Sequence, residues 1–562
     1  MDENIELDDA APWLVIAITL MGFFLRALQL NIKSMWLDET FSVWMASQSV
    51  ADMLQWVVKI DQHPPLYYLL LHYWVSAFGD TPYYARLLSA LFGAGTIPIL
   101  YLIGKRLGGV MIGLAAPVFL AVSTLSIYVS QETRMYALLT FNAAVAIYAL
   151  VRLLTDPRAS AQPFGSEFRQ YPSVWRAAGK FDPGEEDGSR LPYQPRNQSG
   201  WRAWISRHRG LHLETIQTDL AWVAFIVFSV ATLFSHNTAV LFPLATNVTV
   251  LGLILFQRLK KPAGQPSLHA PSLRNWIIAQ IATLLLWSPW LPLFVKQAGG
   301  VDQRFWIPAP TWDTILWSLR SFLNASAPLS EGVSWVVWGL YGGVLLLGAV
   351  YFRKKLSQFF FLAGLFAIPI LGELLVSLRR PIYSERTLIW VTIPLFIFLA
   401  AGISKLRNRF VIFIAIGVFG SINLFSAGDY FRWFQKEDWS TPAGYVAKFA
   451  EKGDLVLFNS NFTVIPFNYY FRQYEDLYSI EIERQGVPKD LIQDAILEPE
   501  MTEADIPALI SLVSGEDRVW LVYSHDSYTD PNGLVPQTLD SQMTVTRTRE
   551  FYGGVVYLYE RP

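Results

Sequence analysis

Long apolar stretches dominate the chain and alternate with short polar segments. A helix needs roughly 20 apolar residues to cross the hydrocarbon core of a bilayer. The pattern predicts a mainly α-helical, polytopic membrane protein with about 11 transmembrane helices. The predicted spans are residues 11–31, 86–104, 110–128, 135–152, 219–235, 238–256, 276–295, 333–352, 357–377, 387–403 and 410–427.

Three polar regions interrupt or follow this pattern. Residues 32–85 form a loop after the first span, and residues 153–218 form an insertion rich in Pro, Gly, Ser and Arg. Such a composition is typical of a mobile segment. Residues 429–562 are polar enough for a separate soluble domain, so the membrane domain is predicted to cover residues 1–428.

The region 429–562 carries signals of a small α/β domain without a nucleotide-binding fingerprint. Thr441 before Pro442 fits a helix N-cap with proline in the first turn. Thr502 with Asp505 fits a capping box for a second helix. The predicted strands are Leu455–Asn459, Val519–Ser524 and Val555–Glu560.

Composition agrees with a membrane protein, because 52% of residues are hydrophobic and only 16% are charged, whereas soluble proteins carry about 25%. The absence of cysteine excludes disulfides, zinc–thiolate sites and a cysteine nucleophile. With a net charge of −2, the composition gives no indication of a polyanionic partner such as a nucleic acid. The acidic start of the chain lacks the basic region of a signal peptide, so we expect the first apolar stretch to be retained.

Basic residues in the short loops orient the spans, because cytoplasmic loops are enriched in Lys and Arg. With the N-terminus inside, the short inner loops carry twelve basic residues and no acidic ones. The insertion 153–218 then lies inside, and the odd span count places 429–562 outside the cytoplasm. We expect a multi-pass protein of the cell (inner or plasma) membrane. The inner loops are 105–109, 257–275, 353–355 and 404–409.

Two adjacent carboxylates, Asp38 and Glu39, follow the first span in the sequence W-L-D-E-T. On a helix or strand they point in different directions, so one can act while the other anchors. An ordinary acidic loop explains these two residues equally well.

The same outer loop contains Asp61, His63 and Tyr67 within D-Q-H-P-P-L-Y-Y. The prolines prevent a helix at that point, and the aromatic side chains suit the headgroup level. His63 fits a metal ligand or a partner for substrate, although a lone histidine is more often structural. His236 in a later outer turn is a weaker candidate for the same cavity.

Two further clusters of ionisable residues lie on the outer side. Glu132, Arg134 and Tyr136 flank apolar sequence, where charged groups persist when they are paired or used. A structural ion pair to another helix is the alternative.

Arg379, Arg380 and Arg386 surround Tyr383 on the outer side, against the bias of basic residues toward the inside. A guanidinium binds phosphate oxygens in a bidentate manner, so an outer phosphate explains the cluster. A lipid headgroup anchor is the alternative. Glu373 within the preceding span is expected to pair with one of the arginines.

These clusters together predict a site for a phosphate, an apolar tail and a sugar. ATP and nucleotide sugars are cytoplasmic, and the chain has no P-loop. An outward-facing transferase therefore needs a donor carried across the membrane on a lipid, such as a polyprenyl phosphate sugar.

Four motifs occur in a characteristic order along the chain: W-L-D-E, H-P-P-L-Y-Y, S-Q-E-T-R-M-Y-A-L and a Tyr/Ser-x-Arg turn before a late span. Their order resembles the GT-C superfamily of glycosyltransferases. The closest group is glycosyltransferase family 39, similar to protein O-mannosyltransferases and the lipid A aminoarabinose transferase. The resemblance covers the chain to about residue 150, with 380–390 and the K-E-D-W sequence at 436–439. The insertion 153–218 departs from the family pattern.

The resemblance implies a GT-C fold and inverting transfer of a sugar from a polyprenyl-phosphate donor to a hydroxyl of a protein, lipid or glycan. Asp38 would be the catalytic carboxylate, with Glu39 positioning it or binding acceptor. Arg386, with the other outer arginines, would stabilise the leaving phosphate. Those arginines are Arg379, Arg380 and Arg134.

Three further expectations concern metal binding, the alternative functions and the substrate-binding residues. Some relatives bind a divalent metal near the first outer loop, and the residues leave open whether this chain does. A flippase or transporter of lipid-linked sugars and a non-catalytic assembly protein are the alternative functions. The metal candidates are Asp61, His63 and His236. The substrate-binding candidates are Asp61, His63, Tyr67, Glu132, Tyr136 and Tyr383.

Overall fold

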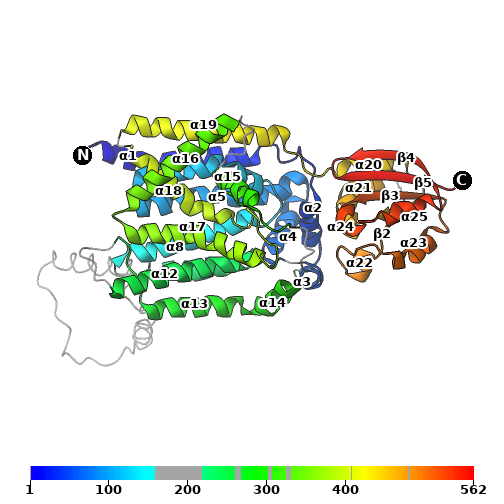
Figure 1. Ribbon diagram of the computed structural model, residues 1–562, viewed down its shortest axis with the longest axis horizontal. Helices are drawn as coiled ribbons and strands as arrows, with labels where there is room; N and C mark the ends of the chain where they lie inside the picture. The colour runs from blue at the N-terminus through cyan, green and yellow to red at the C-terminus, as the bar shows by residue number, and fades with distance from the viewer. Residues whose placement is uncertain are drawn as a thin grey trace, which may run out of the picture.

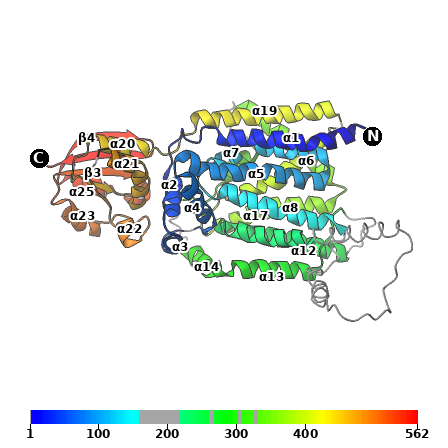
Figure 2. The same cartoon turned by 180° about the vertical axis from the view of Figure 1, so that it is seen from behind.

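A bundle of long helices joins a smaller α/β domain at one end, and the N-terminal end of α1 lies at the opposite end (Figure 1; Figure 2 shows the reverse side). The predicted insertion at 153–218 falls almost entirely outside the described residues. The computed structural model describes residues 2–157, 218–259, 267–300, 307–323 and 331–562, apart from 62, 407, 479 and 480.

Within this described part, eight helices are long and apolar enough to cross a membrane. They confirm a mainly helical, multi-pass architecture. These helices are Leu7–Ala27 of α1 (Asp2–Ala27), α5 (Pro82–Gly108), α8 (Tyr136–Thr155), Asn237–Leu259 (η1 with α12), Leu273–Gly299 (α13 to α14), Gly332–Phe352 of α16 (Glu331–Phe352), α17 (Leu356–Ser377) and α19 (Arg409–Trp433).

The other predicted spans correspond to a bent pair and two shorter helices, so every predicted window falls on an apolar helix. Helices α6 (Val110–Val122) and α7 (Thr124–Ser130) meet at an angle of 60°. Ser123 caps α7 by accepting a hydrogen bond from the Ser126 N–H. The first span was predicted too far toward the C-terminus, at 11–31, because α1 ends at Ala27. The shorter helices are Thr218–Leu233 and Ile389–Ser404, the latter formed by η3 (Ile389–Val391) and α18 (Thr392–Ser404).

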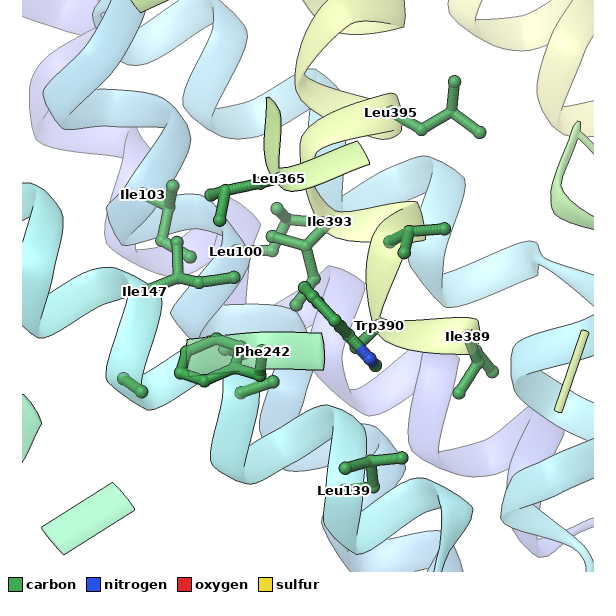
Figure 3. Close-up of a cluster of buried hydrophobic side chains, with 14 of the residues drawn as sticks. Leu100, Ile103, Leu139, Ile147, Phe242, Leu365, Ile389, Trp390, Ile393 and Leu395 are labelled. Carbon is green, nitrogen blue, oxygen red and sulfur yellow. The ribbon is translucent and has the colours of Figure 1, made fainter. Parts of the chain in front are cut away.

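The bundle is held together by an apolar core in which side chains from α5, α8, α12 (Leu241–Leu259), α17 and η3–α18 meet (Figure 3). Leu100, Phe242 and Trp390 are all buried in it. Helices α16 and α18 approach closely at Gly402, where a Cβ would collide with the Val344 carbonyl. The packed helices form a scaffold for loops at the end that faces the α/β domain.

Three short helices of the loop 32–85 lie across that end of the bundle, between the spans and the α/β domain (Figure 1). They are α2 (Leu37–Ser47), α3 (Val50–Lys59) and α4 (Leu66–Phe78). The break between α3 and α4 coincides with Pro64 and Pro65, as the sequence predicts. This arrangement brings Asp38 and His63 to the interface between the two parts of the molecule.

The C-terminal domain contains a five-stranded sheet in the order β2-β1-β3-β5-β4. Strand β1 runs parallel to β2 and β3, whereas β5 pairs antiparallel with β3 and β4. The three predicted strands are confirmed as β1, β3 and β5. The strands are β1 (Leu455–Phe458), β2 (Glu483–Gly486), β3 (Arg518–Ser524), β4 (Thr544–Phe551) and β5 (Gly554–Glu560).

The helix starts in this domain were predicted with mixed success. The capping box of Thr502 with Asp505 is present. The Thr441 cap was wrong, because α20 begins at Ser440 and its first N–H groups bond to the Asp438 carboxylate. Helix α19 continues to Trp433, beyond the predicted boundary at 428. The remaining helices include α15 (Trp312–Leu323), α20 (Ser440–Phe449), η4 (Asn461–Thr463), α21 (Val464–Tyr478), α22 (Leu491–Asp494), η5 (Glu503–Asp505), α23 (Ile506–Val513), α24 (Asp526–Thr529) and α25 (Leu534–Asp540).

Candidate active site

A cavity of about 430 Å³ lies where the bundle, the loop 32–85 and the C-terminal domain meet. Its volume is in the range of small-ligand sites. Predicted site residues from four separate segments share it, which supports the expectation that one outer site gathers them. The predicted residues that line it are Asp38, Asp61, His63, Arg134, Tyr136, His236, Arg380 and Arg386.

The other predicted residues do not line the cavity. Glu39, Glu132, Tyr67 and Tyr383 are buried in the surrounding protein. Tyr67, for example, hydrogen-bonds the Ser89 hydroxyl at 2.9 Å. These four buried residues support the walls of the cavity without contacting it. Arg379 also does not line the cavity, and its side chain is exposed.

The first turn of α2 separates the two adjacent carboxylates. The side chain of Asp38 is 29% exposed and lines the cavity, whereas that of Glu39 is fully buried. Carboxylates in a first helical turn interact favourably with the positive end of the helix dipole. The helix therefore gives two neighbouring residues of the same chemistry different environments.

Glu39 is the centre of a buried ion network below the cavity. Its carboxylate accepts two hydrogen bonds from Arg86 (2.8 and 2.7 Å), one from Lys436 (2.9 Å) and one from the Thr133 N–H (2.9 Å). Burial opposes its ionisation, but Arg86 and Lys436 outweigh burial and lower the pKa of Glu39 to about 2. Glu132 lies 3.7 Å from Lys436 at the same network. The network joins α2 and α5 to the linker of the C-terminal domain.

Glu39→Gln is expected to destabilise the protein by about 3 kcal/mol at neutral pH, because it leaves the buried Arg86 without its carboxylate partner and Lys436 with Glu132 alone. The folded pKa of Glu39 lies below the ordinary 4.5, so its contribution is complete above about pH 5 and is lost as the pH falls toward 2. Thermal unfolding of both proteins in detergent should therefore differ most at neutral pH and converge in acid. A difference that is absent at neutral pH, or that does not shrink in acid, would contradict this role.

Arg134, His63 and Asp61 form a hydrogen-bonded chain along one wall. Arg134 Nη2 lies 3.4 Å from His63 Nε2, and His63 Nδ1 lies 2.9 Å from Asp61 Oδ1. Because arginine only donates, His63 Nε2 accepts and its Nδ1–H donates to the carboxylate. Arg134 Nε also lies 3.8 Å from Asp38 Oδ2. Burial opposes the charge of Arg134, but Asp38, Asp61 and two nearby tyrosines together outweigh burial and raise the Arg134 pKa. This hydrogen-bonded chain of side chains holds the Arg134 guanidinium beside the carboxylate of Asp38, the candidate catalytic residue.

The residues present do not fit a metal site. No group of three or more His, Cys, Asp or Glu side chains is placed to hold a metal ion in the described ranges. Both ring nitrogens of His63 are already engaged, one of them by the cationic Arg134. His236 packs its ring against that of His63, with ring centroids 5.2 Å apart. We therefore derive no chemical step through a metal.

Arg386 lies between two aromatic rings on the cavity wall. Its guanidinium carbon is 5.6 Å from the ring centroid of Trp36 and 5.5 Å from that of Tyr136. Such stacking on aromatic faces stabilises the cation and leaves its N–H groups available for an anion. Burial opposes the charge of Arg386, but Tyr136 and neighbouring acidic groups raise its pKa. Arg386 is thus a fixed cation in the cavity.

The loop that carries Arg386 is anchored by Glu373 of α17. The Glu373 carboxylate accepts hydrogen bonds from the Thr387 hydroxyl (2.7 Å) and the Ser384 N–H (3.4 Å). The expectation that Glu373 pairs with an outer arginine was therefore wrong, because the loop itself supplies its partners. Ser384 and Thr387 line the cavity, so these contacts shape the site directly.

Sequence reasoning missed the wall that the C-terminal domain provides. Phe462, Leu497 and Glu498 line the cavity from that side. It also missed Arg86, whose position in an apolar span would have identified it as a paired charge. Nothing in the local sequence around Glu498 indicates a site, because its approach to the cavity depends on how the two domains dock.

Known proteins match this chain in part of its sequence and in its overall fold. Residues 62–164 match the family model of dolichyl-phosphate-mannose-protein mannosyltransferases. The fold is similar to ArnT from Cupriavidus metallidurans in the apo state (TM-score 0.56, 12% identity, 98% of each chain). It is also similar to the same protein bound to undecaprenyl phosphate (TM-score 0.54, 12% identity, 98% of each chain). The apo oligosaccharyltransferase of Archaeoglobus fulgidus matches with a TM-score of 0.50 and 9% identity, over 95% of this chain and 73% of that chain.

A search among curated protein sequences finds no match. The structural likeness extends over nearly the whole chain, including the C-terminal domain. The chain therefore has the GT-C fold of membrane glycosyltransferases, as the motifs predicted. At this level of identity the likeness shows the fold, and the chemistry must be argued from the residues in the cavity.

Proposed function

We propose that this protein is an inverting glycosyltransferase that moves a sugar from a polyprenyl-phosphate donor to an acceptor hydroxyl on the extracytoplasmic side. One observation carries the proposal. A single cavity at the end of the spans combines the carboxylate of Asp38 with the guanidinium groups of Arg134, Arg380 and Arg386. These groups match the base and the phosphate ligands that the reaction requires.

The transfer is a displacement at the anomeric carbon. Asp38 accepts the proton of the acceptor hydroxyl as its oxygen attacks that carbon. The bond from the anomeric carbon to the phosphate oxygen breaks, and polyprenyl phosphate leaves with the bonding electron pair. Arg386 and Arg380 stabilise the charge that develops on the phosphate. Attack from the face opposite the leaving group inverts the anomeric configuration.

The apolar walls of the cavity suit the first isoprene units of the donor. Polar side chains gather at the end near the C-terminal domain, whereas transporters carry their substrate sites near the bilayer midplane. ArnT of the same fold was solved with undecaprenyl phosphate bound, which supports a lipid phosphate here. The apolar lining includes Val240, Leu241, Phe294, Ala298, Val376 and Ile382.

The distribution of basic residues among the short loops supports the proposed side of the reaction. We place the N-terminus in the cytoplasm and the cavity with the C-terminal domain outside the cytoplasm. The acceptor is then an exported protein, a membrane lipid or a glycan of the cell envelope that reaches the outer surface.

One experiment tests both the reaction and its side. Sealed right-side-out and inverted vesicles that contain the protein are given polyprenyl phosphate carrying a radiolabelled sugar, with a panel of hexose and pentose donors. Right-side-out vesicles should label their own outer components and release polyprenyl phosphate, because the donor sugar does not cross the membrane unaided. Labelling in inverted vesicles alone would contradict the proposed side, and no donor consumption in either would contradict the proposed function. Vesicles lacking the protein are the control.

A further inference from the structure

Glu498 brings a carboxylate from the C-terminal domain into the cavity that also contains Asp38. Its side chain forms no hydrogen bond or ion pair with any residue that the structure describes. Burial raises the pKa of Glu498, with His525 opposing this and Asp38 adding to it. A partly buried carboxylate without a partner is available to a ligand.

The backbone around Glu498 is built to present this side chain. Glu498 has a φ of +53°, a conformation that is costly for a residue other than glycine. The fully buried Asn461 holds it there, because Asn461 Oδ1 accepts from the Glu498 N–H at 3.2 Å while its Nδ2 donates to the Ile496 carbonyl at 2.7 Å. Asn461 packs against Gly486, where any Cβ would collide with it.

The residue next to Asn461 also contributes to the cavity wall. Phe462 follows Asn461 in η4 and, like Glu498, lines the cavity. The buried Asn461 therefore connects the backbone of Glu498 to the turn that carries Phe462, and both side chains line the cavity. Backbone strain maintained by a dedicated hydrogen-bond network is a feature of functional sites.

The sign of the charge indicates which substrate Glu498 meets. The donor phosphate is anionic, so the arginines attract it and Glu498 repels it. The acceptor must reach Asp38 from another side, and the wall from the C-terminal domain carries this second carboxylate. Resting on the proposed function, we propose that Glu498 positions the acceptor by accepting a hydrogen bond from one of its hydroxyl or ammonium groups, and that it disfavours anionic acceptors.

Two variants and a matched control test this role. Glu498→Gln keeps the size of the side chain, and Glu498→Gly removes it while relieving the positive φ, so its loss of function cannot arise from added backbone strain. Glu503→Gln changes an exposed carboxylate of the same domain. Initial rates of sugar transfer are measured in detergent with the full-length protein. Donor is varied at saturating acceptor, and acceptor is varied at saturating donor, with membranes from cells that lack the gene as the acceptor probe.

Both Glu498 variants should need roughly 10- to 100-fold more acceptor membrane for half-maximal rate, as expected when a hydrogen bond to a charged group is lost. Their KM for donor should stay within about twofold of wild type, and Glu503→Gln should match wild type in both. An unchanged acceptor requirement would overturn the proposal, as would an equal effect on donor and acceptor. If the wild type consumes no donor at all, the proposed function fails and this inference fails with it.

Discussion

Asp38→Asn is expected to reduce sugar transfer by roughly 10²- to 10⁴-fold while the protein remains folded in the membrane. The amide keeps the size of the side chain but cannot accept the proton of the acceptor hydroxyl. Arg134 loses a counter-charge 3.8 Å away, yet it keeps its contact with His63, so the wall of the cavity should persist. Turnover of a polyprenyl-phosphate sugar by the purified variant provides the measurement.

The control for this variant is Asp52→Asn, which changes an exposed aspartate of the same loop, residues 32–85. It should transfer sugar at the wild-type rate. Binding of polyprenyl phosphate to Asp38→Asn should also remain close to wild type, because the arginines are unchanged. A near-normal turnover of Asp38→Asn would exclude the general-base mechanism, and a loss of folding would assign Asp38 a structural role instead.

The sequence was informative wherever the signal is local. Hydrophobic length located the spans because the bilayer imposes it, and Pro64 and Pro65 marked the break between α3 and α4. Adjacent residues on a helix point in different directions, so Asp38 and Glu39 were expected to have different surroundings. The structure agrees, because the Asp38 side chain is partly exposed and the Glu39 side chain is buried. Three of the five strands of the C-terminal domain, β1, β3 and β5, were predictable because each is a short run rich in apolar residues, whereas β2 and β4 are mostly polar.

The partners of these residues were not predictable, because they are distant in the chain. Glu39 meets Lys436 across 397 positions and Arg86 across 47. A single sequence contains no information about which buried charges will meet. The same limit hid Glu498, whose place in the cavity depends on docking of the C-terminal domain. The three clustered arginines looked equivalent in sequence, but the turn after α17 exposes Arg379 and directs Arg380 and Arg386 to the cavity.

Arg386→Ala is expected to lower kcat/KM for the lipid-linked donor by roughly 100- to 1000-fold. The guanidinium is held between the rings of Trp36 and Tyr136, so its N–H groups are already oriented when the phosphate arrives. Pre-oriented donors act most strongly on charge that develops during the reaction. Arg386→Lys keeps a charge but loses the planar fork and should fall between alanine and wild type.

The matched control is Arg379→Ala, which removes an exposed arginine from the same turn. Kinetics with varied donor should be unchanged in this variant, and product inhibition by polyprenyl phosphate should weaken only in the Arg386 variants. Equal losses in Arg379→Ala and Arg386→Ala would mean that the turn acts through its overall charge rather than through direct contact of Arg386 with the phosphate. Unchanged donor kinetics in Arg386→Ala would remove the phosphate from this wall, and Arg134 and Arg380 would be the remaining cations of the cavity able to bind it.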